Sequence, residues 1–373
     1  MRSLKLFTPL AAALGVALAV APAPAADEKK PVVDQKRVDE SVEKGLEYLR
    51  KQQSPDGSWS AQGGMYPTTM TGVAGIALLM EGSTCREGKY AECISKAVEW
   101  FLKRSQPNGL LGTPSNPSEA SRYTYGHGYG MLFLACVYGE EDDPTQRKKL
   151  ETLLKKAVEF SCKAVTKHGG WGYVSSADGG GFDEGSTTVT QLQALRACRN
   201  AGIPVPKDTI DKAIKYLKDC TTPAGGLVYN YSGPNPQGGE CQAITAAACA
   251  SACSTGMYHD KYFGMWVKFC KNTVYRQARN NGHDEYTNFY FGQVMYVLGD
   301  DRYMSIIDKE AKRENAMLWS DYKKVMFEHY MKTQGADGGW QPGGGWGVGP
   351  IYATATALLT MQLEKGQVPF YQR

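Results

Sequence analysis

Two kinds of apolar segment alternate along the chain. In the first kind, apolar residues recur at positions i, i+3, i+4 and i+7, and Lys and Glu fill the other positions. This period predicts amphipathic helices with one solvated face. These segments are residues 38–53, 92–106, 147–166, 208–220, 262–276 and 315–334. Three of them carry the related cores KGLEYL, KAVEWFL and KAIKYL, so we interpret them as copies of one repeat.

The second kind of segment is nearly free of charge and lies between the first. Its members are residues 71–82, 125–139, 188–202, 241–256, 286–300 and 351–366. A helix that is apolar most of the way round is a buried helix. Each segment ends in Gly or Gly-Asp, which is typical of a helix C-terminus.

The chain therefore consists of six predicted helix pairs, each with one solvated and one buried member. An open stack of such pairs needs polar caps at both ends. The first and last pairs resemble the middle ones, which favours closure into a ring. The sequence predicts an all-α fold, an (α/α)6 toroid with charge-poor inner helices and charged outer helices.

One phrase, Gln-x-x-x-Gly-x-Trp, follows the first and the last predicted outer helix. Its two copies comprise Gln53, Gly57 and Trp59, and Gln334, Gly338 and Trp340. Degenerate forms follow other outer helices at 106–112, 168–173 and 223–229. The phrase resembles the QW repeat of squalene and hopene cyclases, whose superfamily includes protein prenyltransferase β-subunits and complement-like thioester domains.

This resemblance covers nearly the whole chain after its N-terminal segment and implies the same toroidal fold. In the related family, the Gln and Trp of such turns tie neighbouring outer helices together. Closure of the ring would make the first and last pairs neighbours, so that Trp59 and Trp340 would belong to adjoining segments. One architecture hosts many activities, so function must be argued from the site.

The first 26 residues read as a cleaved signal peptide. Arg2 and Lys5 precede an apolar stretch, and Ala23-Pro24-Ala25 offers a small-residue cleavage site. We therefore expect an exported protein, periplasmic or secreted, with a single toroid domain over residues 27–373. Ten cysteines in an exported chain suggest disulfides, whose pairing the sequence leaves open.

The charge pattern excludes some partners. The net charge of +4 falls to near +2 once Arg2 and Lys5 are removed with the signal. Lysines and acids are interspersed along the helices, which argues against nucleic-acid binding. No second apolar run is long enough to cross a membrane.

Candidate functional residues gather in the loops that lead into the inner helices. These loops converge on one face, where helix N-termini point their N–H groups. The catalytic candidates are His127, Asp183 and Glu240, and the candidates for lining a cavity are Tyr125, Tyr129, Glu184, Cys241, His283, Asp284, Tyr286, Trp346 and Tyr352. Each acidic candidate also suits a helix N-cap, so both roles stay open.

The resemblance to cyclases can be examined at one motif. Hopene-type cyclases protonate an alkene with Asp-x-Asp-Asp-Thr, and neighbouring acids must hold the proton in place. The nearest match is Asp183-Glu184-Gly185-Ser186-Thr187, in which Gly185 and Ser186 replace the paired acids. We therefore expect no squalene-type cyclisation.

The other relatives give equally specific tests. Prenyltransferases bind zinc through Asp, Cys and His, and the nearest residues are Glu240-Cys241 and His283-Asp284. Their spacing departs from the family pattern, and a buried cysteine and a turn histidine explain Cys241 and His283 without metal. We expect no metal and no cofactor. A thioester needs Cys and Gln three residues apart, whereas Cys241 and Gln242 are adjacent.

Two functional hypotheses follow. The first is a binding module for an apolar, isoprenoid or glycan ligand, or for a protein partner on the inner-helix face. The alternative is a non-standard enzyme, cyclase, transferase or lyase-like, that uses Asp183 with His127 or Glu240 on a terpenoid or glycan. The enzyme predicts that these three residues share one open pocket with a shifted pKa. The binding module predicts a ring centre filled by Tyr and Phe.

Overall fold

The computed structural model describes residues 33–373 except 180, 280–281, 344–346 and 372–373. The predicted signal peptide and Trp346 lie outside the described residues. The described part is all-α, apart from four isolated β-bridges in its loops.

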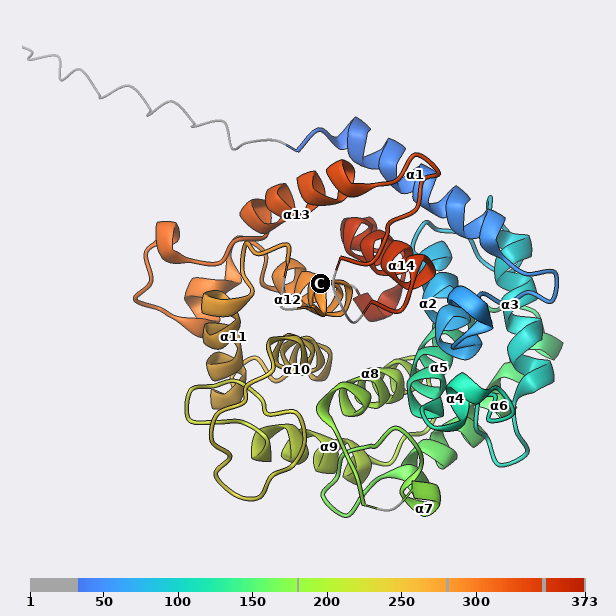
Figure 1. The fold of residues 1–373 in the computed structure, drawn as a ribbon, viewed down its shortest axis with the longest axis horizontal. Coiled ribbons are helices and arrows are strands. Elements are labelled where there is room, and N and C mark those ends of the chain that lie inside the picture. Colours follow the sequence, from blue (N-terminus) through green and yellow to red (C-terminus); the bar gives the residue numbers. More distant parts are fainter. Residues whose placement is uncertain (1–32, 180, 280–281, 344–346, 372–373) are drawn as a thin grey trace, which may run out of the picture. The chain divides into compact units, whose positions relative to one another are not determined.

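Six charge-poor helices form an inner ring (Figure 1). They are α2 (Pro67–Leu79), α5 (Tyr123–Glu140), α8 (Gly185–Asn200), α10 (Gln242–Thr255), α12 (Asp284–Leu298) and α14 (Pro350–Met361). Each contacts the next, and α14 contacts α2, so the ring closes. The predicted toroid is confirmed.

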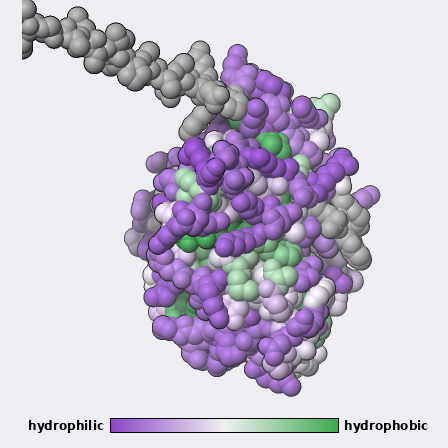
Figure 2. All heavy atoms as spheres, turned by 90° about the vertical axis from the view of Figure 1, so that its left-hand side faces the viewer, coloured by the Kyte–Doolittle hydropathy of each residue, from purple (hydrophilic) through white to green (hydrophobic). Residues whose placement is uncertain are grey.

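Six amphipathic helices surround this ring (Figure 1). They are α1 (Gln35–Gln52), α3 (Ala91–Arg104), α6 (Pro144–Ala164), α9 (Lys207–Asp219), α11 (Lys261–Thr273) and α13 (Trp319–Thr333). The wall seen in Figure 2 is mostly hydrophilic, with small hydrophobic patches between the polar side chains. The described residues include no helix with the length and apolarity that a membrane span requires.

Short helices complete the loops and the C-terminus. They are η1 (Gln62–Gly64), α4 (Pro117–Ala120), α7 (Ser176–Gly179), η2 (Tyr303–Ile307), η3 (Arg313–Asn315), η4 (Leu363–Lys365) and η5 (Pro369–Tyr371). The ten cysteines are free thiols in this structure, and seven are buried.

Small residues let the inner helices approach each other closely. A Cβ atom on Gly72 of α2 would lie 2.8 Å from the backbone of Tyr129 in α5. One on Gly75 would lie 2.5 Å from the ring of Phe133. Glycine at these positions therefore sets the α2–α5 distance, because any side chain would push the helices apart.

Among the described residues, the same close glycine packing follows at least five outer helices. In each turn a glycine with positive φ packs on a carbonyl oxygen of the next outer helix, so close that a Cβ would lie 2.2–2.9 Å from that oxygen. The pairs are Gly57 on Lys96, Gly109 on Lys156, Gly169 on Lys212, Gly225 on Met265 and Gly338 on Lys44. The last pair joins the end of the toroid to its beginning.

The Gln and Trp side chains of the two full phrases have different partners. Gln53 Nε2 donates to the carbonyl of Cys93 in the next outer helix, at 2.8 Å. Trp59 Nε1 instead donates to Leu49 O of its own outer helix, at 2.7 Å. Trp340 Nε1 donates to Tyr330 O in the same way, at 2.9 Å. The glutamine thus links neighbouring pairs, and the tryptophan anchors the turn to its own helix.

Candidate functional site

Tyrosine side chains fill the axis of the ring. The hydroxyl of Tyr129 lies 3.1 Å from that of Tyr352 and 3.3 Å from that of Tyr290. All three residues are buried, and burial raises the pKa of each phenol well above its ordinary value. They are therefore neutral and occupy the volume in which a central guest would lie.

Glu184 caps an inner helix. Its carboxylate accepts from the backbone N–H groups of Ser186 and Thr187, at 2.8 and 2.7 Å, in the first turn of α8. The Tyr125 hydroxyl donates to it at 3.0 Å. Burial raises the pKa of Glu184. The bonds from helix N–H groups identify this carboxyl as an N-cap.

The position of the central cyclase acid has no room for a side chain. A Cβ on Gly185 would lie 2.3 Å from Cγ2 of Ile244 in the neighbouring helix α10. An aspartate there would require α8 and α10 to separate. The tight packing of these helices thus gives a physical reason for glycine at this position.

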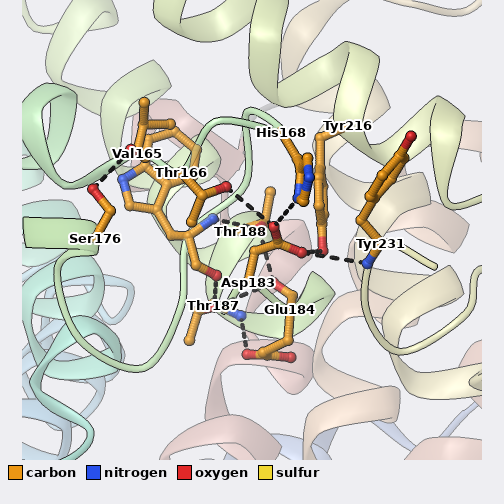
Figure 3. A network of polar contacts seen from close by, with 11 residues as sticks. Val165, Thr166, His168, Ser176, Asp183, Glu184, Thr187, Thr188, Tyr216 and Tyr231 are labelled. Atoms are coloured by element: carbon orange, nitrogen blue, oxygen red, sulfur yellow. Dashed lines mark hydrogen bonds and ion pairs between the residues drawn. The ribbon is translucent and has the colours of Figure 1, made fainter. Parts of the chain in front are cut away.

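Asp183 lies in the network of polar contacts drawn in Figure 3. Its carboxylate accepts from Tyr216 OH at 2.9 Å, from Thr166 Oγ1 at 3.1 Å and from Tyr231 N at 3.3 Å. His168 Nδ1 lies 2.8 Å from the same carboxylate. Asp183 itself is buried.

Glu240 is the counterpart of Asp183 in the next repeat. Each directly precedes the N-cap residue of an inner helix, Glu184 in one case and Cys241 in the other. The hydroxyl of Thr222 donates to Glu240 at 2.9 Å, as that of Thr166 does to Asp183. These two carboxylates therefore fasten equivalent turns.

His168 is the functional candidate that the sequence reasoning missed. In the equivalent turns, Asp56, Asn108 and Asp337 accept an N–H from the residue two positions on. His168 instead faces Asp183, and its ring lies 4.3 Å from that of Tyr231. The side chain remains 28% exposed. The sequence feature that could have identified it is a histidine at a turn position where other repeats have Asp or Asn.

His127 has a structural role. In four repeats a threonine hydroxyl of the inner helix, on Thr71, Thr188, Thr245 or Thr354, accepts an N–H from the turn. His127 takes this position in the second pair, where its Nδ1 accepts from Leu111 N at 3.2 Å. Its Nε2 therefore carries the proton and donates to Ala157 O at 3.1 Å. Burial lowers the pKa of His127 to about 4.

His127, Asp183 and Glu240 thus each bind separate partners, as far as the described residues extend. Among the described residues, these bonds join none of the three to another. Each helps to hold the turn of its own repeat, and His127 and Asp183 also bond the next outer helix, through Ala157 O and Tyr216 OH.

An aromatic platform lies at the entrance to the ring. We use this name for Tyr125, Tyr173, Phe182 and Tyr229. The Tyr173 ring lies 5.8 Å from that of Tyr125 and 5.4 Å from that of Phe182, and its hydroxyl bonds that of Tyr229. Phe182 and Tyr229 are 43% and 44% exposed. The guanidinium of Arg122 lies 4.7 Å from the centroid of the Tyr173 ring.

The most exposed large hydrophobic residues all lie on this face. They are Met65, Phe182, Tyr229 and Val348, each more than a third exposed and each in a loop that leads into an inner helix. Of these four among the described residues, Phe182 and Tyr229 belong to the platform.

The remaining candidates lie on the same face. The Tyr286 hydroxyl donates to Ser186 O at 3.3 Å. Cys241 is the N-cap residue of α10, and burial raises the pKa of its thiol. His283 precedes α12, and Asp284 lies in its first turn beside a cavity of about 230 Å³. Across the described ranges, His, Cys, Asp and Glu side chains form no group of three or more that could hold a metal ion.

Comparison with known proteins identifies the architecture. No family model matches the chain. It is 33% identical to human lanosterol synthase over 84 residues, which cover 22% of this chain and 12% of that protein. A type II terpene cyclase from Scytonema has a TM-score of 0.57 at 13% identity, covering 90% of this chain and 100% of the cyclase.

The chain therefore has an α/α-toroid fold similar to that of this terpene cyclase.

Two sugar-related enzymes share this toroid. An α-1,6-mannanase from Salegentibacter, in complex with α-1,6-mannotetrose, has a TM-score of 0.61 at 9% identity, covering 88% of this chain and 99% of that one. Cellobiose 2-epimerase from Spirochaeta thermophila has a TM-score of 0.61 at 14% identity, covering 91% and 100%. At these identities the likeness shows the fold alone.

Proposed function

We propose that this toroid is a non-cyclising module that binds a glycan on its aromatic platform. The observation that carries the proposal is the contrast between a ring axis filled by Tyr129, Tyr290 and Tyr352 and the exposed rings of Phe182 and Tyr229. A ligand can reach the platform without displacing any buried side chain.

A glycan fits the platform better than an isoprenoid does. The apolar faces of a sugar pack on aromatic rings while its hydroxyls remain in water, so partly exposed rings suffice. An isoprenoid chain gains affinity only where most of its surface is buried. The tyrosines on the axis take up the volume that such burial would need. Arg122, above the Tyr173 ring, adds hydrogen-bond donors for sugar hydroxyls.

Two further points support the proposal. Toroids of this architecture include one solved with α-1,6-mannotetrose and one solved with geranylgeranyl dihydroxybenzoate, so the fold accommodates ligands of both classes. We also propose that the chain is exported through the signal peptide predicted at residues 1–26, which would place it among extracellular glycans.

Titration calorimetry with two classes of ligand tests the proposal. Soluble oligosaccharides, α-1,6-mannotetrose among them, are compared with a geranylgeranyl-bearing aromatic acid. We expect heat of binding from at least one oligosaccharide and none from the isoprenoid. Binding of the isoprenoid alone would overturn the proposal.

The pairing of His168 with Asp183 favours a second candidate function, acid–base chemistry on the bound glycan. Asp183 orients Nδ1 of the imidazole, so that Nε2 on the other side of the ring could exchange a proton with a ligand. Phe182 of the platform is adjacent to Asp183 in the chain. This arrangement would present a platform-bound sugar near the dyad.

Product analysis separates the two functions. Chromatography of oligosaccharides after prolonged incubation should show cleavage or elimination products if the dyad is catalytic, and His168→Gln should abolish them. Glu240→Gln, which changes the counterpart of Asp183 in the next repeat, is the control. Unchanged oligosaccharides in all three proteins would leave the binding function and exclude the catalytic one.

A further inference from the structure

The sequence of the repeated turn departs from its pattern at one interface, between pairs five and six. Residues 274–283, which follow α11, contain no Gly-x-Trp or Gly-x-Leu phrase, although such a phrase follows each of the other five outer helices. In three of the other interfaces, the turn packs on an aromatic residue of the next outer helix. The glycines Gly170, Gly226 and Gly339 approach the rings of Tyr216, Phe269 and Tyr48 in this way.

The aromatic residue is replaced at the same interface. Three outer helices can be aligned on the carbonyl that accepts from the tryptophan of the following turn. Trp59 donates to Leu49 O, Trp171 to Ser161 O and Trp340 to Tyr330 O. The residues before these acceptors are Tyr48, Phe160 and His329. The remaining outer helices carry Trp100, Tyr216 and Phe269 at this position. His329 is therefore the one departure from Phe, Tyr or Trp among the six.

A cavity of about 230 Å³ adjoins His329. Helix α12 contributes Asp284, Glu285 and Asn288 to its wall, and α13 contributes Thr333. Arg279 lies at its edge, and Trp340 with Ala353 and Ala357 of α14 forms an apolar part of the lining. The departures from the repeat sequence at Gly282-His283 and at His329 thus coincide with a polar cavity.

The lining selects a chemical class of ligand. A free cation would be opposed by Arg279, and a free anion by Asp284 and Glu285. A neutral ligand with several hydroxyls avoids both repulsions, because each hydroxyl donates to a carboxylate and accepts from a guanidinium, amide or imidazole. Burial and the charge of Arg279 lower the pKa of His329, although Asp284 acts in the opposite direction. A neutral imidazole can both donate and accept.

We propose that the cavity beside His329 binds a single sugar-sized, polyhydroxylated ring. The apolar lining contacts the C–H face of the ring, and the charged and amide side chains bind its hydroxyls. This site shares no residue with the aromatic platform, so it does not depend on the proposed function of that surface. Its size restricts it to one ring, whereas the platform is open to an extended chain.

One substitution makes the cavity smaller and less polar without departing from the repeat. His329→Phe installs the residue that α6 and α11 carry at the equivalent position, so the folded state should be retained or stabilised. Binding of a panel of free monosaccharides is measured by saturation-transfer NMR and calorimetry. We expect the native chain to bind at least one of them with a Kd of about 1 mM or tighter.

The expected result is that His329→Phe abolishes this binding and leaves the melting temperature equal to or above that of the native chain. His259→Phe, which changes an exposed histidine beyond the C-terminal end of α10, is the matched control and should bind normally. Thr333→Val, a smaller change in the wall, should weaken binding. The proposal is overturned if the native chain binds no monosaccharide, or if His329→Phe binds as the native chain does.

Discussion

Gln334 and Ser41 are joined by two hydrogen bonds although 293 positions separate them in the chain. Gln334 Nε2 donates to Ser41 O at 2.8 Å, and Ser41 Oγ donates to Gln334 Oε1 at 2.8 Å. Gln53 makes the corresponding bond to Cys93 O inside the repeat. The seam of the toroid therefore uses the same linkage as an internal interface, and the chain behaves as a closed repeat with no special end.

The seam should be sensitive to one methyl group. Gly338→Ala places a Cβ 2.5 Å from Lys44 O at φ +92°, so it combines backbone strain with a clash. We expect it to lower the free energy of unfolding by about 3 kcal/mol. Gly202→Ala is the control, because its φ is +88° but its surroundings are open. It should cost about 1–2 kcal/mol. Equal losses of unfolding free energy in the two variants, measured by urea unfolding, would argue against close packing at the seam.

His127 should make stability depend on pH. Its folded-state pKa is about 4, below the ordinary 6.5, because burial disfavours the charged ring. The unfolded chain then binds the proton first, so stability is fully present above pH 6.5 and falls between pH 6.5 and 4. The loss should reach about 3 kcal/mol at pH 4.

The control for this prediction is His127→Gln, which keeps an acceptor and a donor but does not titrate. The difference in unfolding free energy between the two proteins, measured from pH 7.5 to 4, isolates the histidine from the other titrating groups. A difference that does not change with pH would mean that His127 is accessible to protons in the folded state.

Asp183 should matter more for stability than its counterpart Glu240. Asp183→Ala leaves the buried Tyr216 hydroxyl and the Tyr231 N–H without their acceptor, which should cost about 2–4 kcal/mol. Glu240→Ala loses the bond from Thr222 and should cost about 1 kcal/mol. Thermal unfolding of the two variants checks the order, and the reverse order would refute the assigned network.

The fold was predictable because it depends on local pattern. Two alternating kinds of helix and a repeated turn define the toroid, and inner segments such as 241–256 match α10 (Gln242–Thr255) within a residue or two. The segment predicted from 315 begins as a helix only at Trp319, since Leu318 is extended. The apolar spacing from residue 315 onward fits a helix. In the structure, however, η3 and the hydrogen bond from Trp319 N to Gly299 O lie where that helix was predicted to start.

The site was less predictable because its contacts join distant loops. His127 was recognised as a candidate, but its role depends on the N–H of Leu111, 16 positions away. The pairing of His168 with Asp183 required two loops to meet. The cavity beside His329 lies where the sequence departs from the repeat, and such a departure is visible only after the other repeats have been aligned.

The central claim is that the toroid binds a glycan on its aromatic platform. The most direct test is the affinity for the tightest-binding oligosaccharide, measured by calorimetry for the native chain, Phe182→Ala, Tyr229→Ala and Met65→Ala. Met65 is 42% exposed on the same face but outside the platform, so it controls for general loss of apolar surface. We predict that each platform variant weakens binding about tenfold and that Met65→Ala leaves it unchanged. Equal affinity in all four proteins would contradict the account.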